Sequence, residues 1–381
     1  MKQLNNRTII AIFVIWRLFL FIPLFLSEYF LKFREGFGYT SPSYWSSISH
    51  FLVAPWANFD GVYYLIIAAG GYTVDNAGFF PLFPLLINLV SSIFGNIKAF
   101  DPVQFLIALI LSSAFFLIAL FMMSRLILLD YSKNKMIQII LIMLIFPTSF
   151  FFTTIYSESL FLLLLVFSFY FARKGNWFLS GIFAMLLTAT RIVGIAIIPA
   201  LIFEFIKNEK NLFQKKALPL LLSPLGLISY AYFNFKEWGN AFQFISAQGS
   251  LQNERSVDQI ILFPQTIYRY FNILANVSPS IYEWWIAFLE LCAFLLAAIM
   301  LFIAWKKRIR LSYILFSAIA ILIPASTGTF TGMPRYVLIL FPIFIALALI
   351  KNKWIKIVYS IVGIVLLVIL FALFSKGYYV A

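Results

Sequence analysis

The sequence is poor in residues on which many soluble proteins depend. Only 11% of its 381 residues are Asp, Glu, Lys or Arg, against about a quarter in typical soluble domains. It has one cysteine, Cys292, and one histidine, His50. A single cysteine excludes a disulfide framework and a thiolate metal cluster, and a single histidine excludes a multi-histidine zinc or iron site.

Apolar residues are abundant instead. They make up 63% of the chain, and the mean hydropathy is +0.97. Long apolar runs recur from residue 9 to residue 374, and such runs are typical of membrane-spanning helices. The sequence therefore predicts an all-α polytopic membrane protein, with residues 1–381 forming one integral-membrane domain.

The predicted spans follow the apolar runs. They are residues 9–31, 103–128, 136–152, 157–172, 217–235, 284–305, 311–325, 335–350 and 354–374. Residues 9–31 lack a small-residue cleavage site after them, so we expect a retained first span rather than a signal peptide. Residues 177–206 are expected to form a hairpin that turns near Arg191. Residues 79–95 are expected to form an interfacial or re-entrant helix that begins at Pro81 or Pro84.

The distribution of charge decides whether residues 177–206 form a hairpin or a single span, and whether residues 79–95 span the membrane or lie at its interface. It also sets the orientation of the bundle. The net charge of +14 comes from short basic clusters between the apolar runs, which indicates cytoplasmic loops rather than a nucleic-acid-binding face. Only the hairpin over residues 177–206 keeps most Lys and Arg on the side of the N-terminus. The prediction is a bundle of about 11 transmembrane helices with two long external loops, residues 32–102 and 236–283, the first carrying short interfacial helices.

One aspartate stands out in the first external loop. The stretch WANFDGVYYLIIAAGGY, residues 56–72, places Asp60 among aromatic, aliphatic and glycine residues. Burying a carboxylate there without compensation costs free energy. Asp60 is therefore either the N-cap of a helix that ends at Gly70 and Gly71 or a catalytic carboxylate. The two roles are compatible, because a cap leaves one carboxylate oxygen exposed.

Three further ionisable residues lie at the ends of predicted spans. Arg335 follows Pro334 and is interpreted as an anion-binding group, because guanidinium matches phosphate geometry, or as an interfacial arginine that snorkels to water. Arg191, at the hairpin turn, is either a second anion-binding group or a structural partner of Glu158 or of backbone carbonyls. Glu158 is interpreted as stabilising the N-terminus of its own helix.

Five stretches of the chain resemble a known family when taken in order. They are NFDGVYYLIIAAGGY, FFPLFPLL, YSESLFLLLL, TRIVGIAIIPALIFEF and MPRYVLILFPIF. Together they resemble the PIG-V family, mannosyltransferases of the glycosylphosphatidylinositol pathway and their prokaryotic relatives, within the GT-C superfamily of glycosyltransferases. The resemblance extends over about residues 7 to 345.

The resemblance implies a GT-C-type bundle with a catalytic aspartate in the first external loop and a polyprenyl-phosphate sugar donor, most often carrying mannose. Asp60 matches the acidic position of the family's tryptophan–aspartate motif, and Phe59 stands where the family commonly has tryptophan. Arg335 matches the arginine of the family's Pro-Arg-Tyr stretch. Arg191 matches the arginine that follows the short fifth helix.

Neighbours of these residues are expected to contact substrate, with Trp56 stacking on a sugar ring. The expected substrate-binding residues are Trp56, Phe59, Tyr63, Tyr156, Glu158 and Tyr336. No residue is assigned to a metal, although a divalent cation held by Asp60 with Asp75 or Glu158 stays open. No nucleotide-binding unit is visible, and a lipid-phosphate donor needs none, because it carries its own activated leaving group.

The predicted function is inverting transfer of a sugar, with Asp60 as general base and Arg335 on the donor phosphate. The acceptor is a glycan, a glycolipid or a protein. The expected location is the cell membrane, or the endoplasmic reticulum membrane in a eukaryote, with the active site on the external side. The alternatives are a lipid flippase or transporter and a non-catalytic subunit of a membrane complex; only a transferase would release free polyprenyl phosphate.

Overall fold

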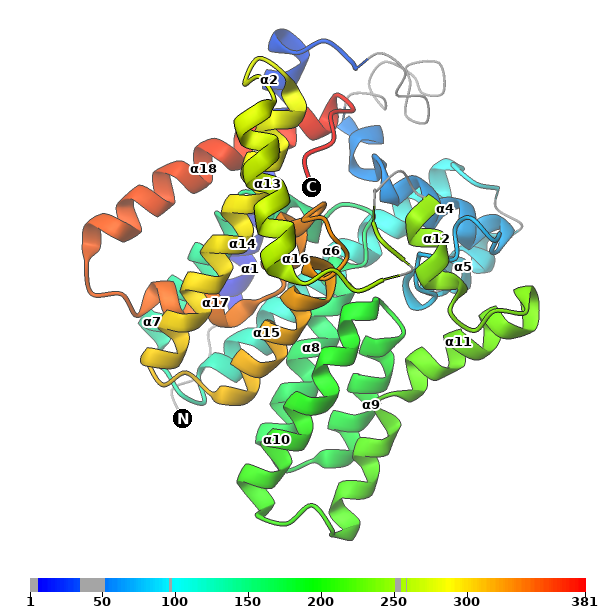
Figure 1. Ribbon diagram of the computed structural model, residues 1–381, viewed down its shortest axis with the longest axis vertical. Coiled ribbons are helices and arrows are strands. Elements are labelled where there is room, and N and C mark those ends of the chain that lie inside the picture. Colours follow the sequence, from blue (N-terminus) through cyan, green and yellow to red (C-terminus); the bar gives the residue numbers. More distant parts are fainter. Residues whose placement is uncertain (1–5, 35–51, 96–97, 251–254, 258) are drawn as a thin grey trace. The chain divides into compact units, whose positions relative to one another are not determined.

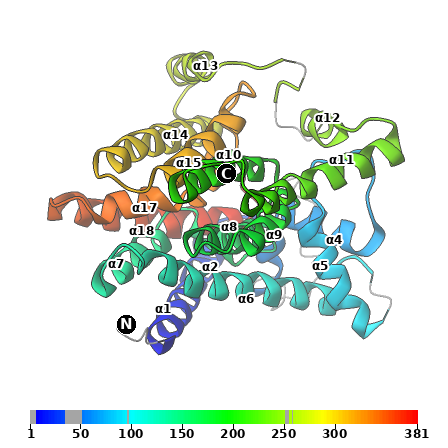
Figure 2. The ribbon, with the colours of Figure 1, turned by 90° about the horizontal axis from the view of Figure 1, so that it is seen from below.

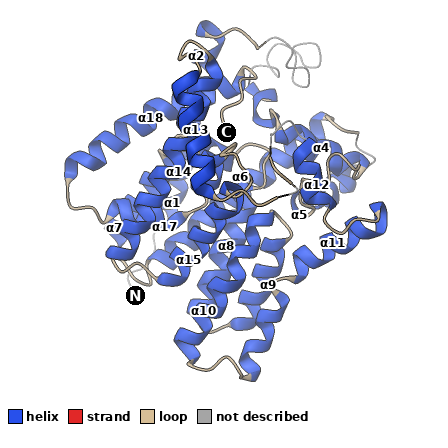
Figure 3. Cartoon of the chain, viewed as in Figure 1, coloured by secondary structure: helices blue, strands red, loops and turns tan. Residues whose placement is uncertain are grey.

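The computed structural model describes residues 6–34, 52–95, 98–250, 255–257 and 259–381, so that His50 lies outside the described residues. The described chain is helical, with one isolated β-bridge between Ile261 and Thr327 (Figure 3). This confirms the all-α prediction.

Five helical stretches among the described residues are long and apolar enough to cross a membrane. They are Asn6–Phe30, Pro102–Ile127, Lys215–Trp238, Tyr282–Lys306 and Lys353–Ser375. Shorter apolar helices accompany them: Asp60–Gly70, Leu82–Phe94, Trp177–Thr188 and Leu311–Ala325. The prediction of a polytopic membrane protein is confirmed.

The chain divides into two compact units, the first of which consists of Met1–Gly70, Phe83–Leu163 and Ile350–Val380. Its helices are α1 (Asn6–Phe19), α2 (Phe21–Phe30), α4 (Asp60–Gly70), α5 (Leu82–Ser91), α6 (Pro102–Ile127), α7 (Lys133–Leu144), the first turns of α8 (Glu158–Arg173) and α18 (Lys353–Ser375), with 3₁₀ turns at Ala54–Ala57, Ser92–Phe94 and Ser149–Phe152. Helix α18 packs on α2 and on the 3₁₀ turns Ala54–Ala57 and Ser149–Phe152. The last turn of α18 therefore lies next to the segment that carries Asp60.

The second unit consists of Gly71–Leu82, Leu164–Leu349 and Ala381. Its helices are the rest of α8, α9 (Trp177–Thr188), α10 (Ile197–Glu209), α11 (Leu225–Trp238), α12 (Gln243–Ser250), α13 (Phe263–Asn276), α14 (Tyr282–Lys306), α15 (Leu311–Ala325), α16 (Met333–Leu338) and α17 (Phe341–Ala348), with 3₁₀ turns at Ile192–Ala196 and Lys215–Leu222. Helix α14 packs along α13, α15, α16 and α17 (Figures 1 and 2).

The predicted hairpin over residues 177–206 is present. Helix α9 ends at Thr188, and the chain resumes helical structure at Ile192. The open ends of the two arms meet, because the Trp177 Nε1–H donates to Glu209 Oε1 at 3.2 Å and the Trp177 ring packs on Phe205. These bonds require α9 and α10 to run antiparallel, with the turn at Arg191.

Glycines allow α9 to pack unusually closely on the segment that follows α10. A Cβ on Gly181 would meet the Pro219 carbonyl oxygen at 2.2 Å, and a Cβ on Gly226 would meet the Met185 carbonyl oxygen at 2.0 Å. Both distances are far below van der Waals contact, so backbone rather than side chain fills these crossings.

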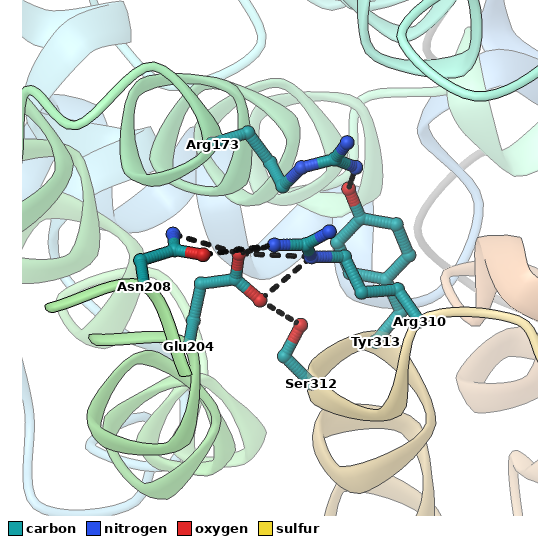
Figure 4. Close-up of polar contacts among 6 residues, drawn as sticks. All are labelled: Arg173, Glu204, Asn208, Arg310, Ser312 and Tyr313. Carbon is teal, nitrogen blue, oxygen red and sulfur yellow. Dashed lines mark hydrogen bonds and ion pairs between the residues drawn. The ribbon is translucent and has the colours of Figure 1, made fainter. Parts of the chain in front are cut away.

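A polar cluster joins α8, α10 and α15 at the end of the second unit where α9 begins (Figure 4). Glu204 is fully buried and pairs with Arg310, whose Nε lies 2.8 Å and 2.9 Å from the two carboxylate oxygens. The Ser312 hydroxyl donates to the same carboxylate at 2.6 Å, and Arg173 donates to the Tyr313 hydroxyl at 2.9 Å. The basic loop after α8 and the basic loop before α15 therefore lie at the same end of this unit. The distribution of Lys and Arg predicted both loops on one side.

Four predicted spans are interrupted. The span 9–31 divides into α1 and α2, and the span 217–235 begins as the 3₁₀ turn Lys215–Leu222 before α11. The predicted span 136–152 ends its α-helix at Leu144 and continues as a turn and the 3₁₀ turn Ser149–Phe152. The predicted span 335–350 divides into α16 and α17, with Leu340 outside helical geometry. Proline accounts for the last two breaks: Pro147 follows the end of α7, and Pro342 lies in the first turn of α17. Proline lacks the N–H that would continue a preceding helix and is tolerated in a first turn.

Candidate active site

Asp60 is the first residue of α4. The helix runs from Asp60 to Gly70 and is followed by Gly71 with φ +81°, so that the predicted helix and its glycine end are confirmed. The Asp60 side chain is half-buried. A carboxylate at this position interacts favourably with the positive end of the helix dipole and still reaches solvent.

Phe59, directly before Asp60, has an unusual backbone conformation. Its φ of +60° lies in the left-handed region, which costs a non-glycine residue about 1–2 kcal/mol. The ring packs on Phe374 and Tyr379, with ring centres 5.5 Å and 5.7 Å away. Such strain persists only where surrounding contacts hold it.

Tyr156 supplies the main polar contacts at this turn. Its hydroxyl donates to the Asn58 carbonyl at 2.7 Å and accepts from the Asp60 N–H at 3.2 Å, so that one side chain bridges the residues on both sides of Phe59. The Ile155 N–H also donates to the Trp56 carbonyl at 2.8 Å. Tyr156 is buried, so we assign it a positioning role for Asp60 rather than a contact with substrate.

Replacing Tyr156 with phenylalanine removes this bridge and keeps the ring. We expect transfer to slow by about tenfold, because small misplacement of a reacting group is costly, with little change in the KM for donor. The measurement is initial rate against donor concentration. Tyr64→Phe is the matched control, because it removes another buried hydroxyl, which donates to Ser157 at 3.0 Å; equal losses in both variants would contradict a specific effect on Asp60.

Trp56 is packed on every side. It is 1% exposed, with the Arg17 guanidinium 3.6 Å from its ring centre and the Phe371 ring at 4.8 Å. Its indole N–H donates to the Leu52 carbonyl at 2.8 Å. The sequence-based interpretation of Trp56 as a sugar-stacking residue therefore does not fit this packing, and Trp56 supports the loop instead.

The remaining predicted residues of the first unit differ in exposure. Tyr63 is half-buried and lies one turn after Asp60, on the same face of α4. Glu158 is buried at the first turn of α8, the position expected from its helix-dipole role. In the part of the chain that the structure describes, no group of three or more His, Cys, Asp or Glu side chains is arranged to hold a metal ion.

Arg335 lies in the second unit, in the short helix α16. Gly332, with φ +78°, is the N-cap of this helix, and Pro334 occupies its first turn. Arg335 is 7% exposed. A guanidinium buried to this extent does not extend into water as a snorkelling side chain would.

Two other arginines face the residue next to Arg335. The ring of Tyr336, itself 7% exposed, has the Arg191 guanidinium 5.1 Å and the Arg255 guanidinium 5.9 Å from its centre. Arg255 also donates to the Tyr336 hydroxyl at 3.4 Å. We refer to Arg191, Arg255 and Arg335 as the arginine cluster. It contains both arginines selected from the sequence and one, Arg255, that sequence reasoning missed.

Glu290 was also missed. It is 3% exposed in α14, where it accepts hydrogen bonds from the Tyr270 hydroxyl at 2.6 Å and from the Gly332 N–H at 3.0 Å. It interacts electrostatically with Arg255 and Arg335. A carboxylate within an apolar run of a spanning helix is a functional candidate by default, and that signal would have identified it. Glu290 ties the N-cap of α16 to α13 and α14.

The comparison with known families identifies the chain. Residues 5–223 match the mannosyltransferase (PIG-V) family. The match includes Asp60, Tyr156, Glu158 and Arg191 and ends before α16. No curated protein and no solved structure matches the chain significantly. Because the match covers more than half of a chain that is built from membrane-spanning helices, the protein belongs to the PIG-V mannosyltransferase family and is a membrane-integral glycosyltransferase that takes a sugar from a donor to an acceptor at the membrane.

Proposed function

We propose that this protein is an inverting mannosyltransferase that uses a polyprenyl-phosphate mannose donor at the external face of the membrane. Asp60 acts as the general base, and Arg335 and Arg191 bind the donor phosphate. The observation that carries the proposal is the Asp60 carboxylate, half-buried on a strained turn that a buried tyrosine bridges. Strain held by surrounding contacts is typical of functional sites.

The base has a defined task in this reaction. The acceptor hydroxyl attacks the anomeric carbon of the sugar and transfers its proton to Asp60, as a carboxylate activates the nucleophile in inverting glycosidases. The bond between the anomeric carbon and the phosphate oxygen breaks, and its electron pair stays on the phosphate. The products are a glycoside of inverted configuration and a polyprenyl phosphate.

The arginines have the complementary task. The donor phosphodiester carries one negative charge and leaves as a phosphomonoester, which gains a second. Positive groups held in place before the reaction stabilise this developing charge without reorganising. The burial of Arg335 strengthens such an interaction, because the local dielectric constant is lower than in water.

The test is acceptor-dependent release of free polyprenyl phosphate. Purified protein is mixed with a short-chain polyprenyl-phosphate mannose and with candidate glycan, glycolipid and peptide acceptors, and the lipid products are measured by mass spectrometry. We expect polyprenyl phosphate and mannosylated acceptor in equal amounts. Movement of intact donor across proteoliposomes, with no release of polyprenyl phosphate from any acceptor, would instead indicate a flippase.

A further inference from the structure

Arg255 connects two parts of the second unit. It lies in the predicted second external loop, where its Nη2 donates to the Thr331 carbonyl at 3.0 Å and its Nη1 donates to Gln248 at 2.9 Å. The residues after Arg255 lie alongside the segment that precedes α16. The Ser256 N–H donates to the Thr327 carbonyl, and the Ile261 N–H donates to the Ser326 carbonyl. Arg255 is therefore held beside the residues that lead to Arg335.

The donors of Arg255 are only partly used. A guanidinium has five N–H donors. The hydrogen bonds of Arg255 go through Nη1 and Nη2, whereas its Nε–H is buried and donates to no residue that the structure describes. A buried N–H without an acceptor costs free energy, and an oxygen of a bound phosphate would supply one.

The charge around Tyr336 also points to an anion. The arginine cluster contributes three positive charges, and the Glu290 carboxylate, which interacts with Arg255 and Arg335, contributes one negative charge. Positive charge therefore predominates among these four side chains. Grouped guanidinium ions repel one another, and a shared anion relieves that repulsion.

We propose that Arg255 is a third phosphate-binding residue, which acts with Arg191 and Arg335 on the phosphate of a lipid-linked phosphate. This inference rests on the proposed function and adds a residue from the second external loop to its donor site. An excess of positive charge around the phosphate favours the doubly charged leaving group over the singly charged donor. Stronger binding of the departing state than of the ground state is what accelerates transfer.

Arg255 also connects α12 to the residues before α16. Because Arg255 is bonded to the residues before α16 and to Gln248 on α12, a phosphate bound at its Nε–H would hold these parts of the unit together.

The test measures binding rather than turnover. The probes are a short-chain polyprenyl phosphate and the matching polyprenol, which lacks the phosphate, and the readout is calorimetric titration of purified protein. We expect Arg255→Gln to weaken binding of the phosphate by tenfold or more, since loss of a charged hydrogen bond commonly has this effect. Binding of the alcohol should not change. Arg255→Lys, which keeps the charge and loses the fork geometry, should lie between.

Arg269→Gln is the matched control. Arg269 also donates to a carbonyl of the same segment, that of Gly328 at 3.1 Å, so both variants lose one arginine contact to residues 327–331. Equal weakening in both variants, or equal weakening for phosphate and alcohol, would assign the effect to loop stability and overturn the inference. Unchanged phosphate binding in Arg255→Gln, with binding lost in Arg335→Ala, would overturn it too and leave the proposed function intact. Full activity of Asp60→Asn would count against the proposed function alone.

Discussion

Replacing Asp60 with asparagine should lower the rate of sugar transfer by about 100-fold or more, the usual contribution of a general base. Asparagine keeps the shape of the side chain and can still accept a hydrogen bond at the start of α4, but it cannot take a proton from the acceptor. The loss should appear in kcat, whereas binding of a polyprenyl phosphate should be unchanged. Initial rates of mannose transfer and a binding titration measure the two effects.

Asp75→Asn is the matched control for this substitution. Asp75 is exposed in the same predicted external loop, so the variant removes the same charge from a nearby part of the chain. It should transfer mannose at the parental rate. A purified Asp60→Asn protein that turns over at near-normal speed would show that another group is the base.

The second large effect is expected at Arg335. Replacing it with alanine should reduce transfer by at least 100-fold, because the transition state loses a buried charged contact to the departing phosphate. Lysine keeps the charge but not the two parallel donors, so Arg335→Lys should lie between the parent and Arg335→Ala. The effect should be larger on kcat than on donor affinity, since the phosphate gains charge as transfer proceeds.

If Arg335 only snorkels to water, we expect a different order of transfer rates among the variants. Lysine would then replace Arg335 fully, and alanine would lower only the thermal unfolding temperature. Size-exclusion profiles and unfolding temperatures of all variants separate loss of fold from loss of chemistry, with Arg269→Ala as the control for removing an arginine next to this segment. Parental transfer by Arg335→Ala would remove the phosphate role from Arg335 and leave Arg191 as the next residue to replace.

Local signals predicted several elements closely. Helix α4 begins at Asp60 and ends at Gly70, as the aspartate and the two glycines indicated, and α5 begins directly after Pro81. The hairpin of α9 and α10 followed from the distribution of Lys and Arg. These features depend on neighbouring residues or on total charge, both of which are visible in the sequence.

Long-range contacts account for what the sequence could not show. Arg255 meets Tyr336 across 81 residues, and Glu290 meets Gly332 across 42. No periodicity or motif links such positions. The left-handed backbone of Phe59 was not predictable either, because its residue type disfavours that conformation and contacts with distant residues hold it in place.

The pairing of α9 with α10 constrains how the chain enters a membrane during synthesis. The first arm, α9, has 12 residues and spans about 18 Å, which is less than the roughly 30 Å of a hydrocarbon core. The first arm is therefore not a stable stop on its own, and we expect the two arms to leave the translocon together, after the contact between Trp177 and Glu209 has formed. A helical pair that crosses the membrane and returns to the same side leaves the orientation of every later segment unchanged. Loss of one arm would invert the orientation of the segments that follow α10.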